Sequence, residues 1–190
     1  MKSKIFFILF PALTLFLQLV ESYAQIAPER PGKWAIKVKT CDLDNLYKLN
    51  DSIYRSEQPN KKEFICLAGS GFRSVLNLRS CTVDSRKTKG LSIKPYKVKM
   101  VARKFSDKEI VESLRILKEM PKPIVVHCKH GSDRTGVVIG MYRIIFENWS
   151  KEEALDELQN GGYGFHKKYS NIIEYIKNVD PEIIKREVLN

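Results

Sequence analysis

Alternation of apolar and polar side chains predicts β-strands in the first half of the chain. Trp34, Ile36 and Val38 alternate with small or basic residues, as in a strand with one exposed face. Similar short runs follow at 46–49, 52–55, 72–78 and 94–101. The first two of these runs are joined by Asn50-Asp51, a turn-forming pair, and therefore predict a hairpin. The polar residues 80–90 predict a loop between the last two runs.

Capping signals predict helices along the rest of the chain. In a capping box, a Ser or Asn side chain is followed three positions later by Glu. The chain contains this pattern at Asn60 with Glu63, at Ser106 with Glu109 and at Ser150 with Glu153. The helices that these pairs open are predicted to end at Gly69, Pro121 and Gly161. A further helix is predicted over 169–179, before Asp180-Pro181.

One segment joins a buried strand to a buried helix. Residues 124–127 form a short apolar run that is followed by a glycine-containing loop, as expected for a strand covered on both faces. Residues 135–146 are apolar nearly all round, as expected for a helix in the core. Strands come first, then this strand-loop-helix unit, then helices. This order predicts an α/β sandwich with a central sheet.

The N-terminal residues have the pattern of a secretory signal peptide. Lys2 and Lys4 precede an apolar run over 5–20, and Ser22-Tyr23-Ala24 supplies small residues for cleavage after Ala24. The run is short and interrupted for a membrane span of ~20 residues. We therefore expect an exported chain, periplasmic or secreted, that keeps no stable membrane anchor after cleavage. The expected divisions are a signal peptide over 1–24, an N-terminal extension over 25–44 and a main domain over 45–190.

Composition and charge narrow the class of partner. The chain has 190 residues, 43% of them hydrophobic, a formal net charge of +11 and four cysteines, which fits one folded domain. Lysines are spread from Lys33 to Lys185 without a nucleic-acid-binding motif, so we expect no nucleic-acid partner. A basic face fits phosphorylated substrates better. Neither the cysteines nor the histidines have metal-ligand spacing, so we expect no metal.

The chemically informative segment lies between the predicted strand and the core helix. Its sequence is His127-Cys128-Lys129-His130-Gly131-Ser132-Asp133-Arg134-Thr135-Gly136. Successive backbone N–H groups at a helix N-terminus bind an anion and stabilise a thiolate, so the pKa of Cys128 should fall below the free value of ~8.5. Arg134 offers a planar fork to phosphate oxygens, and Gly131 permits backbone geometry closed to other residues. The Thr135 hydroxyl is placed to hydrogen-bond the sulfur.

This segment resembles the loop H-C-x5-R-T/S of the cysteine-based protein tyrosine phosphatase superfamily. The resemblance is to the dual-specificity branch, above all its bacterial and its atypical plant and fungal members. It extends to the flanking segments 53–59, 75–79, 142–143 and 161–164. It implies a dual-specificity phosphatase fold with a mostly parallel sheet over 45–190. It also implies hydrolysis of phosphomonoesters without cofactor, through a cysteinyl-phosphate on Cys128.

The resemblance also implies roles for the neighbouring residues. The predicted phosphate-binding residues are Lys129, His130, Gly131, Ser132, Asp133 and Arg134. His127 is expected below the loop, where it tunes Cys128 by hydrogen bonding rather than attacking the substrate. Arg55 and Arg79 are expected to brace the core. Tyr163, Phe165 and His166, after a pair of glycines, are expected to pack near the pocket or to form its rim.

The general acid that protonates the leaving oxygen has more than one candidate. Asp107 lies just before a capped helix, where atypical members of the superfamily carry an acidic residue, although it would also stabilise that helix N-terminus. Asp133 directly precedes Arg134, as in some phosphoinositide phosphatases, although it would also brace the loop. Asp84, in the loop after Arg79, is a third candidate.

The substrate class also stays open at this point. Phosphotyrosine, phosphoserine and phosphothreonine proteins are the first expectation. Lys129 and His130 put positive charge inside the loop, which would suit inositol phosphates or phosphoinositides as an alternative. A phosphate-binding module without turnover is the alternative from another class, against which the intact Cys128, Arg134 and Thr135 argue. We expect a monomer.

The remaining cysteines predict one disulfide in an exported chain. Cys41 precedes the first hairpin and Cys81 follows a central strand, so both are expected near the surface and a Cys41–Cys81 bridge is predicted. Cys66 lies on a predicted helix and is expected to be buried as a small hydrophobic residue.

Overall fold

The computed structural model describes residues 30–190. The predicted signal peptide, its cleavage point and residues 25–29 of the N-terminal extension lie outside the described residues. Within the described part, no helix combines the length and the apolar character that a membrane crossing requires.

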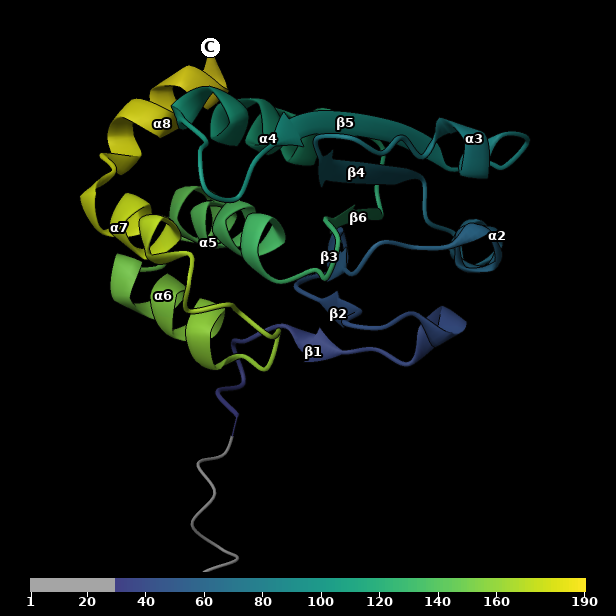
Figure 1. Ribbon diagram of the computed structural model, residues 1–190, viewed down its shortest axis with the longest axis horizontal. Coiled ribbons are helices and arrows are strands. Elements are labelled where there is room, and N and C mark those ends of the chain that lie inside the picture. Colours follow the sequence, from purple (N-terminus) through teal and green to yellow (C-terminus); the bar gives the residue numbers. More distant parts are fainter. Residues whose placement is uncertain (1–29) are drawn as a thin grey trace, which may run out of the picture. The chain divides into compact units, whose positions relative to one another are not determined.

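The strands form one sheet of six in the order β1-β2-β3-β6-β4-β5 (Figure 1). Their bounds are β1 Ile36–Lys37, β2 Tyr47–Lys48, β3 Ile53–Ser56, β4 Ser74–Arg79, β5 Lys94–Met100 and β6 Ile124–His127. The four strands β3, β6, β4 and β5 run parallel, whereas β1 and β2 pair antiparallel at one edge. The predicted α/β class with a mostly parallel sheet is therefore confirmed, and so is the hairpin of β2 and β3.

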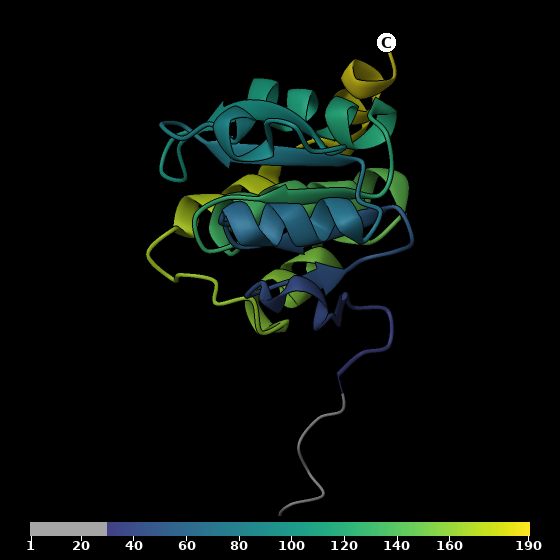
Figure 2. The same cartoon turned by 90° about the vertical axis from the view of Figure 1, so that its right-hand side faces the viewer.

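Helices cover both faces of this sheet. One side carries α4 Asp107–Glu119, α5 Asp133–Phe146, α6 Lys151–Asn160, α7 Ser170–Asn178 and α8 Pro181–Leu189. The other side carries α2 Lys61–Gly69 and α3 Ser85–Thr88, and Figure 2 shows α2 lying across the central strands. The capping boxes predicted at Asn60, Ser106 and Ser150 are all present, and each opens its helix at the next residue.

Two short elements differ from the sequence predictions. The polar stretch 80–90, predicted as a loop, contains the single-turn helix α3. No helix was predicted beyond Asp180-Pro181, and this pair starts α8: the Asp180 side chain accepts from the Glu182 amide at 2.9 Å, and Pro181 occupies the first turn. A proline is well suited to the first turn of a helix, because an N–H group at that position would have no partner within the helix.

The central strand β6 is buried on both faces, which explains its continuous apolar sequence. Val125 packs with Phe64 and Leu67 of α2, while Ile124 and Val126 belong to the larger cluster beneath α4 and α5. His127, the last residue of β6, pairs with Ser56 of β3 on one side and with Asn77 of β4 on the other. The carboxyl end of β6, where Cys128 follows, is thus held between two parallel neighbours.

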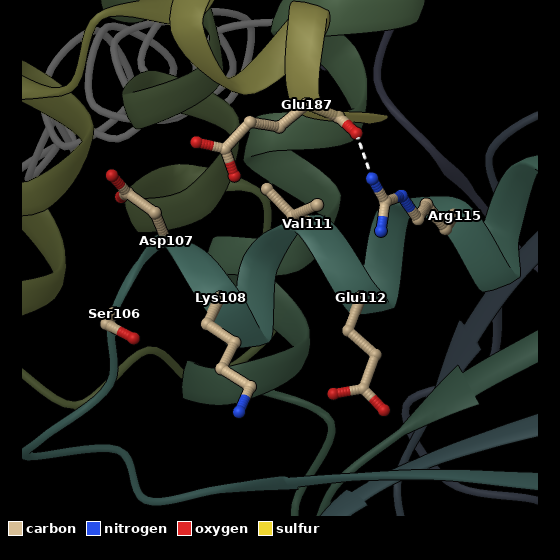
Figure 3. Close-up of a pocket in the computed structure, with 7 residues that line it drawn as sticks. All are labelled: Ser106, Asp107, Lys108, Val111, Glu112, Arg115 and Glu187. Atoms are coloured by element: carbon tan, nitrogen blue, oxygen red, sulfur yellow. Dashed lines mark hydrogen bonds between the residues drawn. The ribbon is translucent and has the colours of Figure 1, made fainter. Parts of the chain in front are cut away.

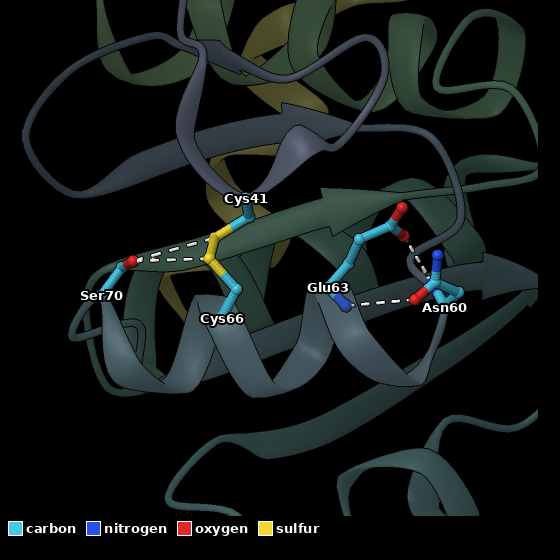
Figure 4. Close-up of a disulfide and its surroundings, with 5 residues drawn as sticks. All are labelled: Cys41, Asn60, Glu63, Cys66 and Ser70. Atoms are coloured by element: carbon cyan, nitrogen blue, oxygen red, sulfur yellow. Dashed lines mark hydrogen bonds between the residues drawn. A yellow bond between two sulfur atoms is a disulfide. The ribbon is translucent and has the colours of Figure 1, made fainter.

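The disulfide joins Cys41 to Cys66, with Cα atoms 5.4 Å apart (Figure 4). It links the short 3-10 helix η1, Thr40–Asp42, to α2. The predicted Cys41–Cys81 bridge is wrong, and so is the expectation that Cys66 is a buried free thiol. The reason is sheet order: β6 lies between β3 and β4, so Cys81, which follows β4, is kept away from the N-terminal strands. Among residues 30–190, the free cysteines are the exposed Cys81 and the buried Cys128.

Candidate active site

The loop of residues 128–134, hereafter the anion loop, joins β6 to α5 and turns its carbonyl groups outward. Each carbonyl from Cys128 to Ser132 accepts a hydrogen bond from a group around the loop. The donors are His127 Nδ1 to Cys128 (3.0 Å), the Gln58 amide to Lys129 (3.2 Å), Asn45 Nδ2 to His130 (2.6 Å), Arg55 Nη2 to Gly131 (2.7 Å) and the Gly136 amide to Ser132 (2.8 Å).

The outward carbonyls fix the direction of the amides. The peptide bonds of the anion loop are trans, since the cis bond among the described residues is Lys122–Pro123. In a trans peptide the C=O and the following N–H point in opposite directions. The N–H groups of residues 129–133 therefore face the inside of the loop, and the N-terminus of α5 adds its own unpaired donors and its dipole. This arrangement is an anion-binding cradle.

Gly131 is the residue that lets the loop close. Its φ of 70° lies in the left-handed region, and a Cβ there would come within 2.5 Å of the Ser56 carbonyl oxygen. Any side chain at position 131 would push the anion loop away from the end of β3. The sequence expectation that this glycine serves backbone geometry agrees with this contact.

The Cys128 sulfur lies at the bottom of the cradle, where the residue is 2% exposed. Burial by itself raises the pKa of this thiol, but the surrounding donors and charge lower it by more. These are the hydroxyl and amide of Thr135, the charge of Arg134 and the amide of His130. The net pKa of Cys128 is therefore below that of a free thiol, as the sequence predicted.

Two buried donors next to the sulfur lack a well-formed hydrogen bond within residues 30–190: Arg134 Nε and the Thr135 hydroxyl. In the described part of the chain, the rest of the Arg134 guanidinium makes a 3.5 Å bond from Nη1 to the Met100 carbonyl. Buried donors are nearly always satisfied, so the unpaired Arg134 Nε indicates that a ligand completes it. An oxyanion in the cradle would satisfy Arg134, and the sulfur itself is the group that Thr135 approaches.

His127 lies beneath the loop in a buried pair with Asp84. Its Nε2 is 2.8 Å from Asp84 Oδ2, and its Nδ1 contacts the Cys128 carbonyl rather than the sulfur. Burial raises the pKa of Asp84, and its bonds to His127 and Gln58 lower it by more, to a net value below the ordinary one. Asp84 is thus an anchor for His127, and its role as a general acid stays a prediction.

The two other predicted acids are both engaged by partners. Asp133 is buried, and its carboxylate accepts from the His166 amide at 3.0 Å and contacts the His166 ring at 3.0 Å. It therefore ties the anion loop to the segment after α6. Asp107 begins α4, and its Oδ1 accepts from the Tyr175 hydroxyl at 2.7 Å.

Asp107 also lines a cavity of about 600 Å³ between α4 and α8 (Figure 3). The lining residues are Ser106, Asp107, Lys108, Val111, Glu112, Arg115 and Glu187. None of them belongs to the anion loop, so this cavity is separate from the cradle. In Figure 3 the Asp107 carboxylate points toward the same region as Glu187.

The outer side chains of the loop have different surroundings. Lys129 and His130 are exposed, and the Ser132 hydroxyl donates inward to the Tyr163 carbonyl at 2.6 Å. Burial lowers the pKa of His130, and the nearby Lys129 charge lowers it further. Tyr163 is buried and its ring lies 3.6 Å from the Arg55 guanidinium carbon, so it packs rather than forming a rim.

Sequence reasoning missed most of the groups that hold the loop carbonyls. Arg55 was expected only to brace the core, yet its Nη2 bonds directly to the loop. No local sequence pattern indicated that Asn45 and Gln58 bind the loop carbonyls or that Asp84 anchors His127. Gln58 does lie within a segment that the family resemblance included.

A buried, low-pKa thiol beneath converging amides and an unpaired guanidinium defines a cysteine-based phosphatase. The sequence profile described as "Tyrosine phosphatase family" matches residues 42–190, and the chain belongs to this family. It is accordingly an enzyme that hydrolyses phosphoric monoesters.

Relatives place it near the dual-specificity branch, as the sequence predicted. It is 30% identical over 170 residues to the dual specificity protein phosphatase TpbA of Pseudomonas aeruginosa, covering 88% of this chain and 76% of TpbA. It is 28% identical over 140 residues to the inositol diphosphatase DSP3 of Arabidopsis thaliana, covering 68% of each chain.

Solved structures agree with the fold. The crystal structure of TpbA superimposes with a TM-score of 0.75 at 29% identity, covering 85% of this chain and 99% of that one. The catalytic core of the phosphatase SIW14 of Saccharomyces cerevisiae, in complex with citrate, gives a TM-score of 0.67 at 28% identity, covering 76% of this chain and 90% of that one.

Proposed function

We propose that this enzyme dephosphorylates its substrates through a cysteinyl-phosphate on Cys128. The thiolate attacks phosphorus, the S–P bond forms and the bond from phosphorus to the leaving oxygen breaks. Arg134 and the amides of the anion loop hold the other phosphoryl oxygens throughout. The observation that carries this proposal is the loop itself, whose carbonyls are all bonded outward around a buried, low-pKa sulfur.

A second step restores the enzyme. Water attacks phosphorus and gives a proton back to the carboxylate that protonated the leaving oxygen, the S–P bond breaks, inorganic phosphate leaves, and Cys128 is again a thiolate. Thr135, whose hydroxyl approaches the sulfur, would stabilise that thiolate as it departs. The leaving oxygen of the first step takes a proton from a carboxylic acid. Asp107 and Asp133 are the residues that we predict for this role. Changing each to Asn separates them, because loss of the acid slows poor leaving groups more than nitrophenolate.

Phosphoproteins are the substrate class that we propose first. The support is the match to TpbA, described as a dual specificity protein phosphatase. A TpbA variant has also been solved in complex with phosphotyrosine, at 28% identity and a TM-score of 0.75 to this chain. A sulfur buried at the bottom of the cradle suits a phosphate carried on a side chain that reaches inward.

Inositol phosphates are a second candidate, favoured by one feature of the loop. Lys129 and His130 are exposed directly beside the cradle and would meet a further phosphate on the same substrate. The inositol diphosphatase relatives match this chain at identities similar to that of TpbA. Hydrolysis of inositol phosphates should therefore depend on Lys129 more than hydrolysis of phosphoproteins does.

A substrate panel separates the two candidates. We expect a phosphotyrosine peptide to exceed inositol hexakisphosphate in kcat/KM by about tenfold or more, without added metal. Lys129→Ala should change the peptide value by less than about threefold, since an exposed charge contributes little. The matched control is Lys89→Ala, which changes the exposed lysine directly after α3. The reverse preference, with a Lys129→Ala loss confined to the inositol substrate, would establish the second candidate.

We further propose that the chain is exported. The Cys41–Cys66 disulfide supports this, because disulfides persist in oxidising compartments. Mass spectrometry of the protein from its own cells should find a periplasmic or secreted chain that begins at Gln25, with the peptides of Cys41 and Cys66 joined. A cytoplasmic chain that retains Met1 would contradict it.

A further inference from the structure

We propose that Asn45 is a positioning residue for the anion loop, and that the Cys41–Cys66 disulfide holds the segment that carries it. This inference rests on the proposed function, because it concerns how the same cradle keeps its catalytic shape. It adds a residue and a covalent restraint that lie outside the loop sequence.

Asn45 bridges two segments with its side-chain amide. Nδ2 donates to the His130 carbonyl at 2.6 Å and to the Tyr163 carbonyl at 3.0 Å. The Ser132 hydroxyl shares both acceptors, at 2.6 Å from the Tyr163 oxygen and at a longer 3.3 Å from the His130 oxygen. The short bond on the His130 carbonyl therefore comes from Asn45.

The peptide that Asn45 holds adjoins the glycine of the loop and can rotate. It joins His130 to Gly131, and its N–H is one of the amides that face the cradle. Gly131 has a φ of 70° and no side chain to resist a flip of this peptide. If the peptide flipped, its carbonyl would face the phosphoryl oxygens in place of an N–H donor. Asn45 opposes that flip by binding the carbonyl from outside.

The segment that carries Asn45 is itself strained. Cys41, Asp42 and Asn45 all have positive φ values, of 68°, 49° and 55°. Asn and Asp adopt this conformation more readily than most residues, whereas for Cys41 it is strained and persists where the surroundings hold it. The holding contacts are the disulfide to α2, the bond from the Glu57 amide to the Asp44 carbonyl at 3.2 Å, and burial of Leu43 and Leu46.

These contacts give the disulfide a consequence beyond stability. The disulfide is the covalent restraint among them, and it lies four residues before Asn45. Without it, we expect the segment 41–45 to relax toward ordinary backbone conformations, which moves the Asn45 amide off the His130 carbonyl. An intact disulfide would then favour the active shape of a loop whose own cysteine must stay reduced.

The test uses Asn45→Gly, which keeps the backbone conformation and removes the amide donor. The control is Asn148→Gly, because Asn148 is an exposed asparagine with a matching φ of 56°. On nitrophenyl phosphate we expect Asn45→Gly to lower kcat by about tenfold, less than the loss of a complete oxyanion donor. It should also weaken inhibition by orthovanadate, whereas Asn148→Gly should change neither.

A mutant cycle then tests the disulfide. The double variant Cys41→Ser/Cys66→Ser should lower kcat in the same direction, and adding Asn45→Gly to it should lower kcat by less than about twofold more, because coupled residues are not additive. Circular dichroism and thermal unfolding establish that each variant is folded. If Asn45→Gly does not fold, Asn45→Asp, which keeps the side-chain shape but has no donor, replaces it.

The outcomes are distinguishable. An inactive wild-type chain would overturn the proposed function. An active wild type with Asn45→Gly and Asn45→Asp at wild-type kcat and vanadate affinity would overturn the role of Asn45 alone. Effects of the disulfide and Asn45 that multiply would show that the disulfide acts elsewhere, and would overturn its link to the anion loop.

Discussion

Replacing Cys128 by serine is expected to reduce turnover of nitrophenyl phosphate by about 10⁵-fold or more, as for removal of a nucleophile in other enzymes. The serine hydroxyl is close in size to the thiol but does not ionise near neutral pH. The donors that lower the pKa of Cys128 therefore have no anion to stabilise in the variant. The assay measures steady-state release of nitrophenolate in the presence of a metal chelator.

The matched control is Cys81→Ser, which changes the other free cysteine among the described residues. Cys81 is exposed, and that variant should keep wild-type turnover. Because the amides of the cradle are unaffected, Cys128→Ser should still bind phosphotyrosine and act as a trap for its substrate. Turnover that persists in Cys128→Ser would show that another group is the nucleophile.

Replacing Arg134 by lysine is expected to lower kcat/KM by about 10²–10³-fold. The charge is kept, but the planar fork is lost, and with it the buried Nε that has no well-formed partner within the described chain. A lysine ammonium offers a point charge that does not follow two phosphoryl oxygens at once. The loss should be larger in kcat than in KM, since the oxygens gain charge density in the transition state.

Arg73→Lys serves as the control for this substitution. Arg73 is exposed directly before the amino end of β4, whereas the anion loop follows the carboxyl end of the parallel strand β6, so Arg73 should tolerate lysine without change in kcat/KM. Kinetics on nitrophenyl phosphate across a range of substrate concentrations separate kcat from KM. An Arg134→Lys enzyme within about threefold of wild type would show that Arg134 does not hold the phosphoryl group.

Features encoded by neighbouring residues were predictable from the sequence. The capping boxes at Asn60, Ser106 and Ser150 are local hydrogen-bond patterns, and each opens a helix as expected. The apolar run of β6 and the loop that follows it also carried their own signal. The loop chemistry was predictable because Cys128 and Arg134 are close in sequence and meet around one turn.

Features that depend on distant residues were not predictable. Asn45 meets His130 across 85 positions, and Asp84 meets His127 across 43, with no sequence pattern linking either pair. The predicted disulfide partner of Cys41 was wrong for the same reason, because the choice between Cys66 and Cys81 depends on the order of strands in the sheet. In this protein the sequence specifies the reacting groups, and the tertiary structure specifies what holds them.

The ionised state of the Cys128 sulfur is most directly tested by the pH dependence of its alkylation. Iodoacetamide reacts with thiolates, so the rate rises as pH passes the pKa, and mass spectrometry assigns it to the peptide that contains Cys128. We expect a midpoint clearly below the free-thiol value of about 8.5, and protection by inorganic phosphate. A midpoint at or above that value, with no protection by phosphate, would contradict it.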